Sequence, residues 1–459
     1  MLKVINIDTA KLGDRSYIAH DGATAIVVDP QRDINRVLEL LEREGLSLGA
    51  VVETHMHNDY LSGGLQLARE HDVPYLVNES DQVSYDRFGV EDNQIIPVGS
   101  FALQALHTPG HTYTHMSYLL LDANQNAQGV FTGGSMLHGS TGRPDLLGKN
   151  HSCELAELQH RSVQRIAELV ADKVSIYPTH GFGSFCSATP TSGDSSTIGD
   201  ERKTNPALLL ERQVYVAQTL KALDAFPSYF EYMGPTNLAG PTPIDLSALK
   251  SLSADEIAKS IATGDWVVDL RSRTSWTSGH VPGSLSFGLD GSMASYLGWF
   301  FPHDGKLILI SDKASDITQA QIELARIGID HPQGSCVEGF SNFSPLNQTR
   351  TVTFKELPQA SNEKVITVLD VRSNSERATS HIEASIHIPI SELVNRIDEI
   401  PQETELWVHC ESGYRAAIAL GILEKSEIKG VLINETYEDC LNVAGIEIIY
   451  GSYDSSLTQ

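Results

Sequence analysis

The sequence contains few cysteines and no long apolar run. Its five cysteines are widely spaced and form no Cys-x-x-Cys pair; they are Cys153, Cys186, Cys336, Cys410 and Cys440. This odd, scattered set does not fit a disulfide framework and favours reduced thiols, so we expect a cytoplasmic protein. No apolar stretch approaches the roughly 20 residues of a membrane-spanning helix. The first residues show no signal-peptide pattern, and no membrane partner is expected.

Positive charge is also scarce. The chain has 33 Lys and Arg against 59 Asp and Glu, which gives a net charge of −26. Such a surface repels nucleic acid and acidic membranes, so we expect no nucleic-acid partner. The length of 459 residues is too great for one hydrophobic core and indicates about three domains.

A cluster of metal-binding side chains follows the apolar run Leu48–Val52. The run predicts a buried strand, and the cluster His55-Met56-His57-Asn58-Asp59-Tyr60 would lie in the loop after its carboxyl end. Open α/β sheets place their chemistry at that end. In an extended loop, His55 and His57 point the same way and can both approach one ion at about 2.0 to 2.1 Å.

Three later segments have the same character. They are Thr108–Thr112 with His111, Phe131–Ser135 followed by Gly142–Leu146, and Tyr177–Gly181 with His180. Each new histidine follows an apolar run and is flanked by Pro or Gly, which is typical of a strand that gives way to a functional loop. Arg143 and Asp145 in the second segment are expected to brace a loop.

In this order and setting, these segments resemble the metallo-β-lactamase fold, most closely its glyoxalase II and persulfide dioxygenase branch. The resemblance covers about the first half of the chain. It implies a first metal site formed by His55, His57 and His111. It places Asp59, Tyr60 and His180 at a second site or around the first.

Two departures from that family pattern bear on the metal. Members with two metals usually carry His where this chain has Tyr60, and a bridging Asp where it has Gly134. The second site would keep only Asp59 and His180, and two protein ligands are too few for such an ion. We therefore expect at most one metal ion per chain.

Persulfide dioxygenases that resemble this chain hold one Fe(II) with two histidines and that aspartate, which leaves positions for O₂ and substrate. Three alternatives follow for this chain. The simplest is a three-imidazole site from His55, His57 and His111, the second adds Asp59, and the third is a site too weak to catalyse a reaction. We expect one Fe(II) per chain, with zinc as the alternative.

Local patterns predict further elements. A hairpin with an Asp-Gly turn is expected over Tyr17–Pro30, and helices over Ile34–Glu44, Gly63–Glu70, Glu157–Ala171 and Leu208–Phe226. Ser187–Thr204 is expected to be a surface loop and Gly234–Pro243 a linker. Cys186 ends a Gly-x-Gly-Ser-x-Cys turn like one in related persulfide dioxygenase fusions, and both a sulfur relay and plain packing remain open for it.

The second half of the chain contains an internal repeat. Val267–Ser272 returns as Val368–Ser373, with an offset of 101 residues between Asp269 and Asp370. Two units of about a hundred residues fit this pattern, and each is large enough for its own core.

The second copy carries a cysteine loop. The strand Glu405–His409 precedes Cys410-Glu411-Ser412-Gly413-Tyr414-Arg415, and a helix follows. A cysteine in this place faces backbone N–H groups and the positive end of the helix dipole, which stabilise a thiolate. Cys410 can therefore carry a sulfane sulfur, with Arg415 as a fixed positive charge and Glu411, Ser412, Gly413 and Tyr414 as the cradle.

This loop resembles the active loop of a rhodanese sulfurtransferase. Its six residues have the length that goes with sulfur transfer, and the resemblance is strong over about residues 365–445. In the first copy, the strand Leu307–Ser311 precedes Asp312, which would fall where Cys410 does. A carboxylate cannot carry a sulfane sulfur, so we expect the first copy to be inert.

The expected architecture is an αββα metallo-β-lactamase-like sandwich (residues 1–240) followed by two α/β rhodanese-like domains (247–350 and 355–459). The resemblance implies that the first domain oxidises a low-molecular-weight persulfide, of glutathione or coenzyme A type, with O₂ to sulfite. Cys410 would transfer sulfane sulfur and give thiosulfate, as in sulfide detoxification. The alternatives are a rhodanese with a non-catalytic scaffold domain, or a mononuclear zinc thioester hydrolase. A homo-oligomer is expected.

Overall fold

A computed structural model describes residues 2–181, 183–191, 193–337 and 343–451, which form two compact units. Unit 1 holds the described residues up to Leu246 together with Ile322–Asp330. Unit 2 holds Ser247–Gln321 and the described residues from His331 onwards. Met1 and residues 452–459, at the ends of the expected domains, and Phe182 of the cysteine turn lie outside the described residues.

Unit 1 contains two six-stranded sheets, each with its strands in chain order. The first sheet consists of β1 (Lys3–Thr9), β2 (Asp14–His20), β3 (Thr24–Val28), β4 (Ser47–Val52), β5 (Tyr75–Asn78) and β6 (Phe88–Val90). The second consists of β7 (Ile95–Val98), β8 (Phe101–His107), β9 (Met116–Leu121), β10 (Ala127–Gly133), β11 (Ser175–Pro178) and β12 (Ser196–Thr197).

Alternating side chains join the two sheets into a sandwich. Tyr17 and Ala19 of β2 point into a core shared with Leu103, Tyr118 and other residues of the second sheet. The residue between them, Ile18, packs in a separate core on the outer face. A single strand therefore contributes to both layers of the core.

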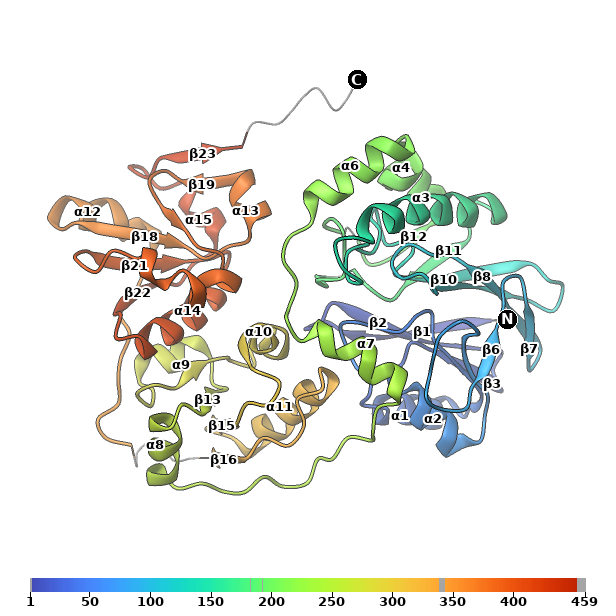
Figure 1. Ribbon diagram of the computed structural model, residues 1–459, viewed down its shortest axis with the longest axis horizontal. Coiled ribbons are helices and arrows are strands. Elements are labelled where there is room, and N and C mark those ends of the chain that lie inside the picture. The colour runs from blue at the N-terminus through green and yellow to red at the C-terminus, as the bar shows by residue number, and fades with distance from the viewer. Residues whose placement is uncertain (1, 182, 192, 338–342, 452–459) are drawn as a thin grey trace. The chain divides into compact units, whose positions relative to one another are not determined.

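Helices cover the outer faces of the sandwich (Figure 1). The helices α1 (Asn35–Glu44) and α2 (Gly64–His71) pack on the first sheet. On the second sheet lie α3 (Ser152–Leu169), α4 (Ile198–Thr204), α5 (Pro206–Leu209) and α6 (Arg212–Ala222). The arrangement confirms the predicted αββα sandwich.

Most of the predicted elements of unit 1 are present. The β2–β3 hairpin, α1 and α2 are confirmed, and α3 begins five residues before the predicted start. The predicted helix Leu208–Phe226 is instead broken between α5 and α6 and ends at Ala222. Two further predictions are wrong. α7 (Phe230–Ala239) is a helix in the predicted linker, and α4 occupies the end of the predicted surface loop. Composition indicated a linker, but Asn237 of α7 bonds to the histidine loop, and such tertiary contacts override local preference.

Unit 2 contains two parallel sheets and a two-stranded ribbon. The first sheet has the order β14-β13-β15-β16, with β13 (Trp266–Asp269), β14 (Leu285–Ser286), β15 (Leu307–Ser311) and β16 (Gly334–Val337). The second has the order β20-β18-β21-β22-β17, with β17 (Thr351–Val352), β18 (Ile366–Asp370), β20 (Ile386–His387), β21 (Glu405–His409) and β22 (Gly430–Ile433). The ribbon pairs β19 (Ser380–Ile382) with β23 (Ile448–Tyr450).

The helices accompany these sheets in the alternating order of α/β domains. They are α8 (Ala254–Ala262), α9 (Arg273–Ser278), α10 (Met293–Phe300), α11 (Ala314–Arg326, whose residues from Ile322 belong to unit 1), α12 (Leu357–Glu363), α13 (Asn374–Thr379), α14 (Tyr414–Lys425) and α15 (Tyr437–Cys440). The equivalent strand orders confirm the internal repeat.

Strand register corrects one predicted equivalence. Asp269 pairs with Ile310 in the first copy, and Asp370 pairs with His409 in the second. The residue after His409 is Cys410, so its counterpart is Ser311 and not Asp312. Strand ends in the sequence do not fix pairing, and a one-residue slip moves every assignment. A hydroxyl is as unable as a carboxylate to carry a sulfane sulfur, and the expectation of an inert first copy stands.

None of the helices in the described part of the chain combines the length and the apolar character needed to cross a membrane.

Candidate metal centre and cysteine loop

Four histidines meet at the carboxyl ends of the unit 1 strands. His55 and His57 lie in the loop after β4, His111 lies between β8 and β9, and His180 follows β11. The centre of the His55 ring is 4.2 Å from that of His57, 4.8 Å from that of His111 and 5.2 Å from that of His180. None of the four is more than 1% exposed, so the cluster is shielded from water.

Hydrogen bonds fix which nitrogen of each ring faces the cluster. His57 Nε2 contacts Glu53 Oε2 at 3.2 Å and the Tyr60 hydroxyl at 3.0 Å, while its Nδ1 is buried with no hydrogen-bond partner among the described residues. His111 Nδ1 donates to the Arg143 carbonyl at 2.8 Å and leaves Nε2 equally without a partner. Buried polar atoms are normally satisfied, so two such nitrogens in one buried cluster of histidines indicate a site for a cation.

His55 and His180 also have a polar partner at Nδ1. His55 Nδ1 contacts the Thr54 hydroxyl at 2.9 Å, and its Nε2 lies 3.2 Å from His180 Nε2. His180 Nδ1 faces two carboxylates, Asp14 at 3.0 Å and Asp59 at 3.1 Å. Carboxylates on the outer nitrogen are the usual partners of metal-binding histidines, because they orient the ring and raise its basicity. The residues present therefore fit a metal ion.

Burial sets the charge state of two of the rings. It lowers the pKa of His55 well below its ordinary value, and it lowers the pKa of His111 to about 3. Both rings are therefore neutral at physiological pH. A neutral imidazole keeps the lone pair that binds a metal.

Carboxylates set the charge state of the other two. Burial opposes the charged form of His57, but Asp29 and Glu53 outweigh burial and raise the pKa of His57 to about 9. Burial acts in the same way on His180, and Asp59 helps to raise its pKa to about 10. Coordination by either ring therefore displaces a proton.

Asp29, which follows β3, connects the loops that carry these histidines. Its carboxylate accepts hydrogen bonds from the Thr54 N–H and hydroxyl, each at 2.7 Å, and from the Thr179 hydroxyl. It also lies 3.4 Å from His57 Nε2. The backbone φ of Asp29 is 49°, a strained value for a non-glycine residue, and the surrounding hydrogen bonds hold it there.

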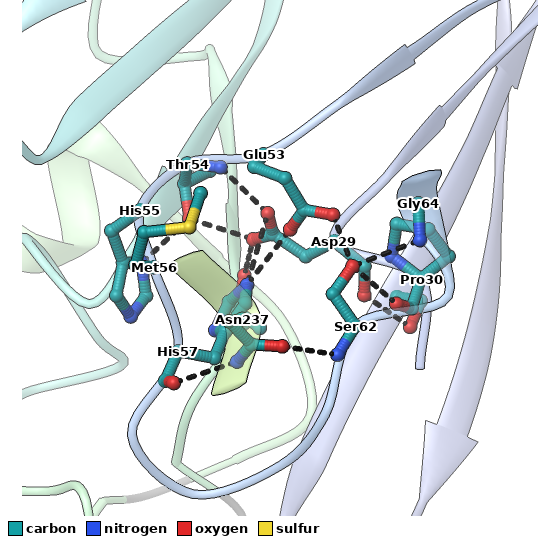
Figure 2. Close-up of polar contacts among 12 residues, drawn as sticks. Asp29, Pro30, Glu53, Thr54, His55, Met56, His57, Ser62, Gly64 and Asn237 are labelled. Carbon is teal, nitrogen blue, oxygen red and sulfur yellow. Dashed lines mark hydrogen bonds and ion pairs between the residues drawn. The ribbon is translucent and has the colours of Figure 1, made fainter. Parts of the chain in front are cut away.

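The loop is braced a second time from α7, as Figure 2 shows. The Asn237 amide donates to the His57 and Tyr60 carbonyls, each at 2.9 Å, and accepts from the Ser62 N–H at 2.9 Å. The Ser62 hydroxyl in turn donates to Glu53. The His57 backbone is therefore held from both ends of its loop.

The structure shows how the chain accommodates Tyr60 and Gly134, the two departures from the family pattern. Tyr60 is fully buried, and its ring stacks on His57 at 4.3 Å, so it supports the His57 ring. At Gly134 an added Cβ would lie 2.3 Å from Cδ2 of His111, and at Gly142 one would lie 2.7 Å from its Nδ1. The His111 ring therefore occupies the space beside position 134 that a larger residue would need.

Cys186 stands beside the cluster. It is fully buried, and its Sγ forms a set of potential ligand atoms with His111 and His180 in which all members lie within 4.8 Å of one another. A second set of this kind contains His55, His57 and His180. His180 is thus shared by both sets, whereas the sequence pattern placed it outside the first site. The trio His55, His57 and His111 stays a prediction.

Sequence reasoning missed several residues of this centre. His115 stacks on His55 at 4.9 Å, and its Nε2 accepts a hydrogen bond from the Gly134 N–H at 2.9 Å. The spacing of His111 and His115 was the available sequence signal for His115.

Asp14 and Asp29 gave no sequence signal, because they precede the histidine loop and reach it only through tertiary contacts. Arg143 and Asp145 form an ion pair at 2.7 Å, in agreement with a bracing role.

In unit 2, the Cys410 loop has the geometry of an anion cradle. Cys410 follows β21 and is 1% exposed, and the Gly413 N–H donates to its Sγ at 3.1 Å. Gly413 has φ 85° and directly precedes α14, so the dipole of that 12-residue helix points at the sulfur. Glu411 and Ser412 are exposed on the open side of the loop.

Two residues of the Cys410 loop have partners that the sequence did not reveal. Arg415 forms two hydrogen bonds of 2.6 Å with Glu376, so its charge is balanced by a carboxylate. The Tyr414 hydroxyl donates to the Gly288 carbonyl of the first copy at 2.8 Å. The copy without a cysteine thus helps to hold the loop of the other.

Comparison with known proteins agrees with this architecture. Residues 14–180 match the family model of the metallo-beta-lactamase superfamily, and residues 353–445 match that of the rhodanese-like domain. The chain is 32% identical over 174 residues to a probable polyketide biosynthesis zinc-dependent hydrolase of Bacillus velezensis, with 36% of this chain and 72% of the relative covered.

Two further relatives extend beyond that segment. The chain is 29% identical over 241 residues to a mitochondrial persulfide dioxygenase of Homo sapiens, with 52% of this chain and 80% of the relative covered. A crystal structure of a metallo-beta-lactamase from Staphylococcus aureus superposes with a TM-score of 0.66 at 27% identity, over 73% of this chain and 99% of that one.

The two-sheet sandwich and its histidine loops are thus those of the metallo-beta-lactamase superfamily, and the chain belongs to it. Within the superfamily this chain is a fusion. Its metallo-beta-lactamase domain has persulfide dioxygenases among its homologues, and a rhodanese-like domain follows towards the C-terminus. The predicted family and fold class are confirmed.

Proposed function

We propose that the chain is a persulfide dioxygenase with sulfurtransferase activity, which converts low-molecular-weight persulfides to sulfite and thiosulfate in sulfide detoxification. The observation that carries the proposal is the occurrence of two sulfur-competent sites on one chain. One is a buried cluster of imidazoles with unpartnered inward nitrogens, and the other is a cysteine loop that can hold an anionic sulfur. The homologous persulfide dioxygenases support this combination.

The metal is proposed to be one Fe(II) per chain, held by His55, His57 and His111 with His180 as a fourth imidazole. Fe(II), when bound, supplies the oxygen chemistry that converts a persulfide to sulfite. The net reaction consumes one O₂ and one water for each persulfide and releases the thiol. Asp29 and Glu53 keep His57 Nδ1 directed inward, and the buried cluster limits competing reactions with water.

Cys410 performs the second step. Its thiolate takes a sulfane sulfur from a donor, so that an S–S bond forms on Cys410 as the donor S–S bond breaks. Sulfite then attacks the outer sulfur, thiosulfate leaves and the Cys410 thiolate is restored. The Gly413 N–H and the α14 dipole stabilise the negative charge on sulfur in both directions.

The remaining proposals concern the setting of the reaction. The thiol carrier is proposed to be of glutathione or coenzyme A type, with O₂ as co-substrate, and the protein is proposed to be a cytoplasmic homo-oligomer. Sedimentation equilibrium of the full chain tests the assembly. Turnover compared between the two persulfides tests the carrier.

A second candidate function for the first domain is a mononuclear zinc thioester hydrolase. The observation in its favour is the 32% identity to a relative described as a zinc-dependent hydrolase. A hydrolase would use the same imidazoles to activate a water. The absence of a carboxylate at position 134 removes the usual bridge for a second ion, and a single zinc would have to act alone.

Iron loading and oxygen uptake separate the candidates. Full-length protein reconstituted anaerobically with Fe(II) should retain the iron and consume O₂ with glutathione persulfide, and His57→Ala should lose both properties. His71→Ala, at the exposed end of α2, is the matched control. Zinc retention with thioester turnover would favour the hydrolase. Failure to retain any metal would leave only the rhodanese with a scaffold domain.

The role of Cys410 has its own test. Cys410→Ser should abolish sulfur transfer from thiosulfate to cyanide and leave oxygen uptake intact. Cys153→Ser, at the exposed cysteine of α3, should change neither. Unchanged transfer in Cys410→Ser would contradict the sulfurtransferase assignment.

A further inference from the structure

Cys186 belongs to the histidine cluster by position. Its Sγ and ligand nitrogens of His111 and His180 lie within 4.8 Å of one another, and all three residues are fully buried. His111 Nε2 in this group has no hydrogen-bond partner among the residues that the structure describes. At such depth an unpartnered nitrogen is costly unless a cation binds it.

The carboxylates around the cluster are directed elsewhere. Asp29 and Glu53 face the outer nitrogen of His57, and Asp14 and Asp59 face the outer nitrogen of His180. Each pair therefore acts on a ring from behind, and Asp59 also lies against the Cys186 thiol. The bridging position 134 is a glycine with no room for a side chain beside His111. In the group of potential ligand atoms that contains His111, the anionic donor is the Cys186 thiol.

The backbone around Cys186 is fixed. The Arg143 N–H donates to the Cys186 carbonyl at 2.8 Å, and the Cys186 N–H donates to the Ser184 hydroxyl at 3.1 Å. Two residues further on, the Ala188 N–H donates to the Thr141 carbonyl at 2.9 Å. The segment after β10, which also bonds to His111 through Arg143, thus holds the thiol against the cluster.

We propose that Cys186 is the anionic ligand of the metal centre and binds the same divalent ion as His111 and His180. Coordination replaces the S–H bond by a sulfur–metal bond and releases one proton to solvent, with no change of oxidation state. The thiolate supplies the charge that a carboxylate at position 134 would supply. Imidazole and thiolate together suit Fe(II) or Zn(II).

The depth of Cys186 distinguishes a ligand from a sulfur relay. A relay thiol must meet one partner at the surface and another inside, whereas Cys186 is 0% exposed. Reactive cysteines lie in partly exposed surroundings, and Cys186 is fully buried. The inference requires an ion at the centre but does not depend on the reaction that the ion supports.

Cobalt provides a direct readout of a thiolate ligand, because Co²⁺ bound to thiolate gives an intense charge-transfer band in the near ultraviolet. Full-length apo protein is titrated with Co²⁺, and band and affinity are recorded for wild type, Cys186→Ser, Cys186→Asp and Cys410→Ser. We expect the band in wild type and in Cys410→Ser, the matched control. Cys186→Ser should lose the band and bind Co²⁺ at least about tenfold more weakly, the smallest loss seen even for outer partners of ligands.

Cys186→Asp keeps a negative charge at the position. It should bind Co²⁺ more tightly than Cys186→Ser, without the band, and it decides the matter if the serine variant does not fold. Wild type that binds Co²⁺ without the band, or a band that persists in a Cys186 variant, would overturn the inference and leave the proposed function standing. Protein that binds neither cobalt nor iron would overturn both.

Discussion

Asp29→Asn should weaken metal binding although Asp29 itself is not a proposed ligand. The substitution keeps the shape of the side chain and an oxygen that can accept from the Thr54 N–H, now at 2.7 Å. It removes the charge that lies 3.4 Å from His57 Nε2. Without a metal that charge favours the protonated ring, and once an ion displaces the Nδ1 proton it favours the ring state in which Nε2 keeps its proton and Nδ1 gives its lone pair to the ion.

The structure sets the size of the effect. His57 Nε2 has three oxygen partners, of which Asp29 and Glu53 carry charge and the Tyr60 hydroxyl does not. Loss of outer partners of metal ligands costs about 10- to 100-fold in affinity, which is about 1.4 to 2.8 kcal/mol. Because Glu53 remains, Asp29→Asn should lie near the tenfold end. The double variant with Glu53→Gln should lie near the hundredfold end.

The assay is calorimetric titration of apo protein with Co²⁺ at constant pH, with circular dichroism to confirm folding. Asp81→Asn is the matched control, since Asp81 is also a buried carboxylate of the first domain and follows β5. We expect its affinity to equal that of wild type. A folded Asp29→Asn protein with unchanged Co²⁺ affinity would refute the claim that this carboxylate orients His57.

Three further predictions concern unit 2, which contains all four tryptophans, so their fluorescence reports its unfolding in urea. Burial lowers the pKa of His409 to about 4, so as the pH falls the unfolded chain takes up a proton before the folded chain does. The free energy of unfolding should therefore fall by on the order of 3 kcal/mol from pH 6.5 to pH 4, and His409→Gln should flatten this dependence. Gly413→Ala should lower the free energy of unfolding by at least about 1 kcal/mol and slow sulfur transfer from thiosulfate to cyanide. The reason is that φ at Gly413 is 85° and the added Cβ would lie 2.6 Å from Asn434 Oδ1. Unaltered sulfur transfer would contradict this prediction. Tyr414→Phe should lower the free energy of unfolding by about 1 kcal/mol, since the Gly288 carbonyl loses its donor, and an equal urea midpoint would count against that contact.

Much of the site could be located from the sequence because its loops follow apolar strands. The runs before His55, His111 and His180 are strands β4, β8 and β11, and each histidine lies in the loop that follows. Short apolar runs and the Pro or Gly residues that follow them are local signals, and they were sufficient to place these loops. The cysteine loop between β21 and α14 could be recognised from the sequence in the same way.

What the sequence could not provide depends on distant partners. Asp14 meets His180 across 166 residues, and Asp29 meets Thr179 across 150. Neither aspartate stands in a motif, so only the folded chain shows that they orient the rings. The same holds for Asn237, whose Gly- and Pro-containing surroundings favoured a linker although they form α7. The sequence also does not show strand register. In unit 2 the pairing of the strands, and not their length, identified Ser311 as the counterpart of Cys410.

The tight fit of the His111 ring against Gly134 and Gly142 has a consequence for laboratory evolution. An aspartate introduced at position 134 would place its Cβ 2.3 Å from Cδ2 of the His111 ring, so this single exchange should destabilise the protein. The ring would have to shift first, and its hydrogen bond to the Arg143 carbonyl keeps it in place. Libraries of one-step variants should therefore miss a carboxylate-bridged centre, and only paired changes on both sides of the ring could reach it.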